Sequence, residues 1–140
     1  MNKLKKTLSF CLLLILASCQ SVQVNNSSHI TEEVVVKVLQ ENSVHLVEAK
    51  PSQENVFGSK LKNVYPGTYE LGGMPFYIYE FATENELEKG MQEFDKKTAT
   101  MDLVSSSMFI KRNILIFYVH EHDPNSESVP YEKEIQEALD

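Results

Sequence analysis

Two stretches of the chain have the apolar pattern of β-hairpins, and the clearer of them surrounds a pair of glycines. Thr68 to Leu71 and Pro75 to Phe81 have the composition of strands, and Gly72-Gly73 between them permits the positive φ angles of a tight turn. The second strand is aromatic or β-branched at nearly every position. We therefore expect it to be covered on both faces and to lie in the interior of a sheet.

The other hairpin pattern comprises Leu103 to Ile110 and Asn113 to Val119. Its turn is expected at residues 111–113, where charged side chains precede an asparagine, a residue type that tolerates the left-handed conformation. Ile114 to Val119 is apolar on both faces, which places this strand near the middle of the sheet as well.

Apolar residues at helical spacing predict one helix before the hairpins and another between them. Thr31 is suited to the N-cap of the first helix, which has acidic residues in its first turn, although its many β-branched residues also fit a strand. The second helix follows Thr83-Glu84-Asn85-Glu86, which has the spacing of a capping box. Its apolar face comprises Leu87, Met91 and Phe94.

A third helix is expected near the end of the sequence, after a break at residues 123–126. Pro130 suits a first helical turn, and one face of the helix is formed by Tyr131, Ile135 and Leu139.

Hairpins alternating with helices define the expected fold class. The stretch 51–67 is rich in turn-forming residues and is predicted to be irregular. Residues 30–140 are then expected to form a single α+β domain, with a small antiparallel or mixed sheet of about four strands and helices packed on it. The order of the strands is left open.

The first residues of the chain have a different pattern, that of an export signal. Lys3, Lys5 and Lys6 precede an apolar run from Leu8 to Leu16. The run has about ten residues, whereas a helix that crosses a bilayer needs roughly 20. A cleaved signal therefore fits the pattern better than a membrane-spanning anchor.

The sequence Leu16-Ala17-Ser18-Cys19 that follows resembles the lipobox of bacterial lipoproteins. The resemblance covers about the first 20 residues and implies removal of residues 1–18 and attachment of diacylglycerol, with its two acyl chains, to Cys19 through a thioether. It also implies a cell-envelope protein on the outer, extracytoplasmic face of a membrane. The alternative is an ordinary secretory signal that leaves Cys19 as a free thiol. Residues 19–29 are mostly polar and suit a short tether.

Charge and cysteine content exclude several classes of function. Loss of residues 1–18 takes three lysines and no acidic residue, leaving ten basic and 20 acidic residues, a net charge of −10. Such a domain is poorly suited to nucleic acid, because binding requires clustered Lys and Arg. Both cysteines lie within the first 19 residues, so residues 20–140 contain no disulfide, thiol nucleophile or cysteine metal ligand. No cofactor motif is present.

One local cluster has side chains that bind metals, His120-Glu121-His122-Asp123. Strand alternation would put His120 and His122 on one face, and two imidazoles with a nearby carboxylate suit zinc or a similar divalent ion. The alternative is a polar strand end that runs into a turn and binds nothing, which we favour because no third or fourth ligand is spaced nearby.

Tyrosine is the other notable residue type because it is common at recognition surfaces and in strands alike. The chain has six: Tyr65, Tyr69, Tyr77, Tyr79, Tyr118 and Tyr131. We expect Tyr77, Tyr79 and Tyr118 to pack in the sheet. Tyr65 and Tyr69 lie beside Pro66-Gly67 in loop-like surroundings and are the first candidates for a ligand-binding surface.

Three functions remain open. The first is a non-enzymatic module tied to the membrane through Cys19 that binds a protein, a peptide or an envelope component. The second is a lipoprotein that binds a small ligand or a metal through His120 and His122. The third, an extracytoplasmic hydrolase, is the least favoured, because Ser105-Ser106-Ser107 has no nucleophile-elbow motif and no base at a local spacing.

Overall fold

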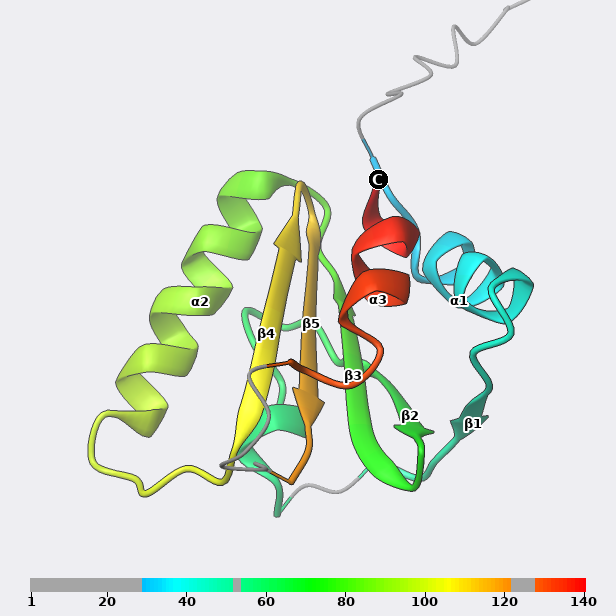
Figure 1. The fold of residues 1–140 in the computed structure, drawn as a ribbon. Helices are drawn as coiled ribbons and strands as arrows, with labels where there is room; N and C mark the ends of the chain where they lie inside the picture. Colours follow the sequence, from blue (N-terminus) through cyan, green and yellow to red (C-terminus); the bar gives the residue numbers. More distant parts are fainter. Residues whose placement is uncertain (1–28, 52–53, 122–127) are drawn as a thin grey trace, which may run out of the picture.

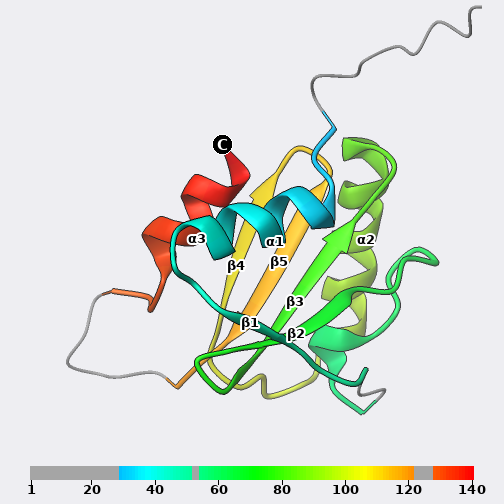
Figure 2. The same cartoon turned by 90° about the vertical axis from the view of Figure 1, so that its right-hand side faces the viewer.

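The computed structural model describes residues 29–51, 54–121 and 128–140. These residues form one antiparallel sheet of five strands in the order β1-β2-β3-β5-β4, so the predicted α+β class is confirmed. Figure 1 shows α2 on one face of the sheet and α1 with α3 on the other, and Figure 2 shows α1 and α3 side by side. The elements are α1 (Glu32–Glu41), β1 (Leu46–Glu48), the short 3-10 helix η1 (Val56–Gly58), β2 (Gly67–Leu71), β3 (Met74–Glu80), α2 (Glu84–Thr98), β4 (Ser106–Lys111), β5 (Ile114–Val119) and α3 (Glu132–Leu139).

The sheet has five strands and not about four because of β1, which the sequence analysis missed. This strand has only three residues, and its pairing with β2 sets Leu46 opposite Leu71 and Glu48 opposite Tyr69. A strand of this length has too few positions for an alternating pattern, so its conformation depends on the neighbouring strand. It forms one edge of the sheet, and β4 forms the other.

The two strands predicted to be interior are confirmed as such. In the sheet order, β3 is central and β5 lies between β3 and β4. Every residue of β5 is buried, as are Phe76 to Tyr79 in β3. Tyr77, Tyr79 and Tyr118 are all buried in the sheet, as their positions in these strands predict.

Both predicted hairpins form, but their turns are built differently. Gly72 and Gly73 both have positive φ angles, 60° and 80°, as the glycine pair predicts. In the β4–β5 turn the left-handed residue is Arg112, with φ 53°, rather than the asparagine that follows it. Asn113 is instead buried. The strand before this turn begins at Ser106, three residues later than predicted.

Helices α1 and α2 begin where their capping threonines place them. The Thr31 hydroxyl accepts a hydrogen bond from the backbone N–H of Val34 at 3.3 Å, and the Thr83 hydroxyl accepts one from Glu86 at 3.1 Å. The prediction that Tyr131 shares a helix face with Ile135 and Leu139 is wrong. Tyr131 precedes α3 as its N-cap, with a φ of 59°, and its side chain is exposed.

Each face of the sheet has its own core, and the two cores are chemically different. The face under α1 and α3 is mainly aliphatic, whereas the α2 face gathers aromatic rings from the strands, α2 and η1. Phe57 of η1 is 2% exposed, so the turn-rich stretch after residue 53 contributes to the core. The Tyr79 hydroxyl lies 2.8 Å from the carbonyl oxygen of Phe57 and secures this segment against the sheet.

Candidate functional site

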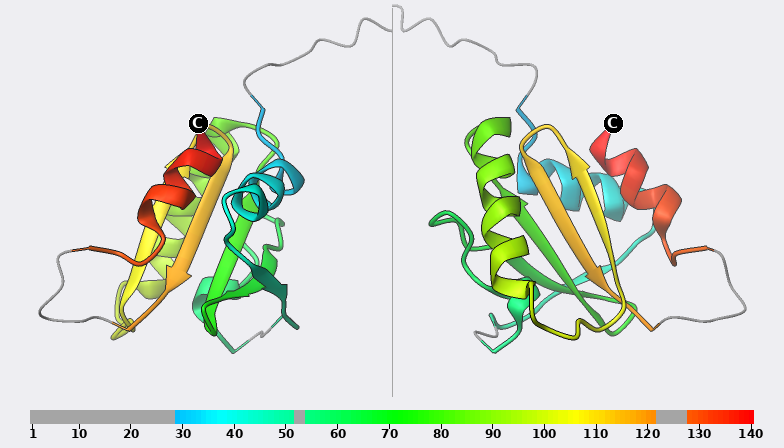
Figure 3. Two further views of the ribbon diagram at one scale, coloured as in Figure 1. Left: turned by 45° about the vertical axis from the view of Figure 1, so that its right-hand side comes forward. Right: turned by 90° about the vertical axis from the view of Figure 1, so that its left-hand side faces the viewer.

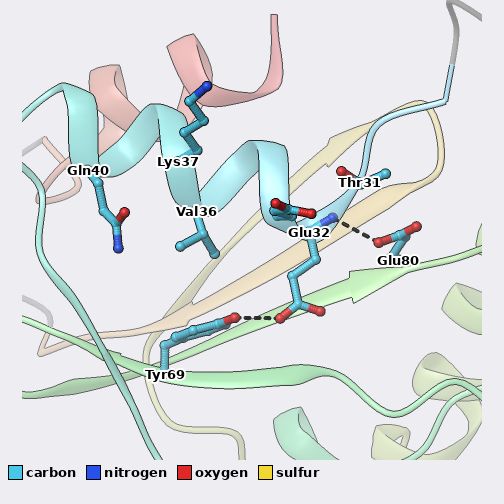
Figure 4. A pocket seen from close by; sticks show the side chains of 8 residues that line it. Thr31, Glu32, Val36, Lys37, Gln40, Tyr69 and Glu80 are labelled. Atoms are coloured by element: carbon cyan, nitrogen blue, oxygen red, sulfur yellow. Dashed lines mark hydrogen bonds between the residues drawn. The ribbon is translucent and has the colours of Figure 1, made fainter.

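A groove of about 740 Å³ lies between α1 and strands β2 and β3 (Figure 4). It contains one of the two tyrosines that the sequence marks as ligand candidates, Tyr69. Three of its other polar side chains are carboxylates, and Lys37 is its basic residue. The lining residues are Thr31, Glu32, Glu33, Val36, Lys37, Gln40, Tyr69 and Glu80.

The centre of this groove is a contact between Tyr69 and Glu32. The Tyr69 hydroxyl donates a hydrogen bond of 2.5 Å to Glu32 Oε1. The Glu32 side chain extends from the first turn of α1 toward β2 (Figure 4). The carboxylate lies against the backbone of Gly67, where an added Cβ would come within 1.8 Å of the same oxygen. The absence of a side chain at Gly67 therefore allows the Glu32 carboxylate of α1 to lie directly against β2.

The same contact changes the acidity of the tyrosine. Burial raises the pKa of Tyr69 well above its ordinary value, and the hydrogen bond to Glu32 and the negative charges of Glu32 and Glu48 raise it further. The phenol therefore stays protonated and acts as a hydrogen-bond donor at neutral pH. Tyr69 lies within β2, as the strand predicted from Thr68 to Leu71 requires, so the loop-like surroundings inferred from Pro66-Gly67 do not apply to it.

The upper end of the groove fixes the chain where it enters the domain. Glu80 Oε2 accepts a hydrogen bond of 2.8 Å from the backbone N–H of Glu32, and Glu80 Oε1 lies 3.1 Å from His29 Nε2. Nearby, Asn113 Oδ1 accepts from the N–H of Ile30, while Asn113 Nδ2 donates to the carbonyl oxygens of Ile30 and Phe81. These polar groups satisfy one another, so the groove as a whole explains the attachment of the N-terminal segment better than it explains ligand binding.

Tyr65, the other ligand candidate, is in different surroundings. Its side chain is 69% exposed in the loop before β2, and Lys60 Nζ lies 5.6 Å from its ring centroid. The structure does not place it in the groove that contains Tyr69. A ligand-binding role for either tyrosine stays a prediction.

The polar strand end after β5 contains His120, the described member of the predicted metal pair. His120 Nε2 lies 2.8 Å from the Ser107 hydroxyl and its Nδ1 lies 3.1 Å from the carbonyl oxygen of Glu121. His122 is outside the described residues. Within the described ranges, no three His, Cys, Asp or Glu side chains gather as metal ligands do. Metal binding through this pair is therefore still a prediction.

The contact between Ser107 and His120 was missed because it is not local in sequence. Pairing of β4 with β5 sets Ser107 opposite Tyr118, and alternation puts the residue two positions further on, His120, on the same face. The backbone N–H of His120 also donates to the carbonyl of Ser105 at 3.2 Å. The signal that would have found the pair is the register of the hairpin, which depends on the position of its two-residue turn.

A third region, the edge formed by β4 and the segment before it, exposes apolar side chains. Met108 is 50% exposed and Val104 is 62% exposed, and both are part of a longer exposed set that comprises Met101, Leu103, Val104, Met108 and Ile110. Figure 3, right panel, shows α2 running beside the β4–β5 hairpin and leaving β4 uncovered. We call this set the β4 surface. The sequence analysis placed all of these residues except Met101 in a hairpin strand, and it assigned none of them a role.

A groove at one end of the β4 surface extends it toward η1. The groove has a volume of about 620 Å³ and is lined mainly by two chain segments, 54–57 and 101–104. Val56 and Phe57 contribute apolar atoms from one side, and Met101, Leu103 and Val104 contribute them from the other. Such grouping of exposed apolar side chains on one side of a domain is typical of interaction sites.

The comparisons with known proteins identify no relative. No protein family, no curated protein and no solved structure matches this chain. In the part of the chain that the structure describes, no helix has the length and apolar character needed to cross a membrane. The function must therefore be argued from the residues themselves.

Proposed function

We propose that this protein is a non-enzymatic interaction module, anchored by lipid on Cys19 to the extracytoplasmic face of a membrane, that binds a protein or peptide through the β4 surface. The observation that supports it best is the set of exposed apolar side chains on the edge strand β4 and on the segment that precedes it. The lipobox-like sequence Leu16-Ala17-Ser18-Cys19 supports the location.

An edge strand can bind a partner both through its backbone hydrogen-bonding groups and through its exposed side chains. Since β4 has a neighbouring strand on one side only, the N–H and C=O groups of alternate residues point away from the sheet. An extended partner segment pairs with these groups, while the exposed side chains of Met108 and Ile110 accept its apolar residues. Burial of apolar area contributes about 25 cal/mol per Å², so a few such side chains matter for affinity.

The location and the surface are consistent with each other. Residues 19–28 connect the proposed lipid site to the first described residue, His29. Ten residues extend to at most about 35 Å, so the domain would contact partners close to the bilayer. Mass spectrometry of the protein from cell membranes should find diacylglycerol on Cys19 and no residues 1–18, and an unacylated product would contradict the anchoring.

The β4 surface is tested by photo-crosslinking in bacterial cells that produce the full-length protein. A photoreactive amino acid at Met108 should give a discrete covalent adduct, because this side chain would lie within the contact. The same amino acid at Val34, which is 48% exposed on α1, is the matched control and should give none. Equal yields from the two positions, or no adduct from Met108, would contradict the proposed surface.

The Ser107–His120 contact favours a second candidate, an extracytoplasmic hydrolase. In such a reaction the Ser107 hydroxyl would attack an ester carbonyl and pass its proton to His120 Nε2, which would return it to the departing alcohol. A water molecule, deprotonated by the same imidazole, would then attack the acyl group on Ser107, and the acid would leave as the proton returned to the serine oxygen. A fluorophosphonate probe should then label the full-length protein and Ser106→Ala but not Ser107→Ala. No labelling of the parent protein would rule out this activity.

A further inference from the structure

We propose that the occupant of the β4 surface is a second copy of this chain, paired with the first in antiparallel fashion along β4 and centred on Phe109. The inference rests on the proposed function, because it names the partner of the same surface. Its result is a continuous sheet across two copies. Four features of the described residues support it: the difference between the sheet edges, the strand register, the distribution of charge, and the point at which the chain enters the domain.

The two edges of the sheet differ in their capacity to pair. The β1 edge has three residues and ends in Glu48, whereas the β4 edge has six residues, none of them proline or acidic. Short length, charge and proline are the usual means by which proteins protect sheet edges from pairing. On β4 only Lys111, at the end of the strand, serves this purpose, and its Nζ is held 2.8 Å from Asp140 Oδ1.

The register follows from the faces of the strand. Two identical antiparallel edge strands in one sheet are related by a two-fold axis perpendicular to the sheet, which keeps each face on its own side. Met108 and Ile110 lie on the α2 face, since they pair with the buried Phe117 and Leu115. An axis through Phe109 sets Met108 opposite Ile110 of the second copy, and the reverse, so four exposed apolar side chains meet across the junction.

The distribution of charge is also compatible with pairing along this edge. The chain has a net charge of −7, yet Leu103 to Asn113 contains no acidic residue. Two copies that meet along β4 therefore bring no carboxylates of this segment together. In the proposed register, Lys111 and Arg112 lie opposite Ser107 and Ser106 of the second copy, so the pairing sets no like charges directly opposite one another.

The position of the N-terminal segment allows both copies to reach one membrane. Ile30 packs in the core under α1 and α3 and is bound by Asn113 at the β4–β5 turn. A two-fold axis perpendicular to the sheet puts this face of both copies on the same side. The two turns would lie four residues on either side of Phe109, or about 27 Å apart at about 3.4 Å per residue. Both entry points would therefore face the same bilayer.

Disulfide trapping in bacterial membranes tests the pairing and its register. Two full-length copies with different tags are produced together, one with Met108→Cys and the other with Ile110→Cys. Residues directly opposite in antiparallel strands have Cα atoms about 4.5–5.5 Å apart, within the range of a disulfide. Mild oxidation should join the two tagged copies, at least about tenfold faster than two Val47→Cys copies, because pairing raises the local thiol concentration.

Val47 is a matched control because it is exposed and lies on the opposite edge strand, β1. Residues 20–140 contain no natural cysteine, and the parent protein is oxidised in parallel to account for Cys19. Adding Ile110→Lys to the Met108→Cys copy should abolish its crosslinks without changing its thermal unfolding. The side chain at position 110 is exposed in one copy and would contact Met108 of the second copy only in the paired form.

The outcomes separate this inference from the proposed function. Rapid joining of Met108→Cys to Ile110→Cys, with slow joining of the Val47→Cys copies, supports the two-fold pairing. Equal rates, or no disulfide between the β4 positions, overturn it. If the disulfide is absent while the photoreactive group at Met108 gives an adduct with another protein, the second copy is excluded as the partner and the proposed function stands. If both give nothing, both proposals fall.

Discussion

The two faces of the sheet hold their helices by different means. On the α2 face the contacts are between rings: the centroids of Phe94 and Phe117 are 4.5 Å apart, and those of Phe57 and Phe117 are 5.4 Å apart. On the other face an aliphatic core is bordered by polar contacts at the N-terminus of α1, including those of Asn113 with Ile30 and of Tyr69 with Glu32.

The two kinds of contact contribute differently to the stability of the domain and to the position of α1. The free energy gained from packing rings and aliphatic side chains is roughly proportional to the buried apolar area, and because it is not directional it tolerates small shifts of a helix. Buried polar groups instead need particular partners, and an unpaired one costs more than an apolar contact that has moved. We infer that the α2 face contributes mainly stability, while the polar contacts fix where the chain enters the domain and where α1 begins.

Phe117→Ala should have the largest effect. The substitution removes a ring that contacts Phe57, Tyr79 and Phe94, and leaves a cavity, so the free energy of unfolding should fall by about 3–5 kcal/mol. Urea denaturation measures the change. Met108→Ala is a matched control because Met108 is opposite Phe117 in the sheet but exposed, and it should cost less than about 1 kcal/mol. Similar losses for both would contradict a closed aromatic core.

Asn113→Ala should have the next largest effect and should be confined to one end of the domain. It removes three hydrogen bonds and leaves the N–H of Ile30 and the carbonyls of Ile30 and Phe81 without this partner, at a cost of about 2–3 kcal/mol. Amide hydrogen exchange should accelerate at Ile30 more than in β3. An even acceleration throughout the domain would argue against a local role.

Asn113 also shows where sequence analysis reaches its limit. Its place in a turn was predicted from local preference, and the turn forms there, but the left-handed conformation falls on Arg112. The side chain of Asn113 is committed to Ile30, 83 residues away. Local rules describe how neighbouring residues shape a turn, whereas a contact over such a separation depends on how the helices pack on the sheet.

The same distinction applies to the other elements. The glycine pair at 72–73 and the capping threonines were predictable because their chemistry acts within four residues. Strand β1 and the Ser107–His120 contact were not, because both depend on strand register. The β4 surface was missed for a similar reason, since the exposure of Met108 and Ile110 depends on α2 passing beside this strand.

Alkaline pH should weaken the domain through tyrosines on both faces. Burial raises the pKa of Tyr69 and of Tyr79 above the ordinary value for tyrosine in the folded domain. In the unfolded chain both groups have the ordinary pKa. The unfolded chain therefore loses these protons first, so their contribution is complete below about pH 10 and declines as the pH rises beyond it. Urea denaturation from pH 8 to 11 should show a plateau followed by a fall. A constant free energy of unfolding across this range would contradict the shifts.

Tyr69→Phe should have the smallest effect of the series. The ring is retained, but the hydrogen bond to Glu32 is lost, and because both side chains are partly exposed, water replaces some of it. The free energy of unfolding at pH 7 should fall by about 1 kcal/mol. Tyr65→Phe is the matched control, since its hydroxyl is on an exposed loop and its loss should change stability by less than about 0.5 kcal/mol. Above about pH 10 the free energies of unfolding of Tyr69→Phe and of the parent should become more similar, because only the parent loses the contribution of the Tyr69 hydroxyl as the pH rises. Equal effects of the two variants at pH 7 would mean that the contact between β2 and α1 contributes no stability, and that the polar border of this face depends on Asn113 and Glu80 alone.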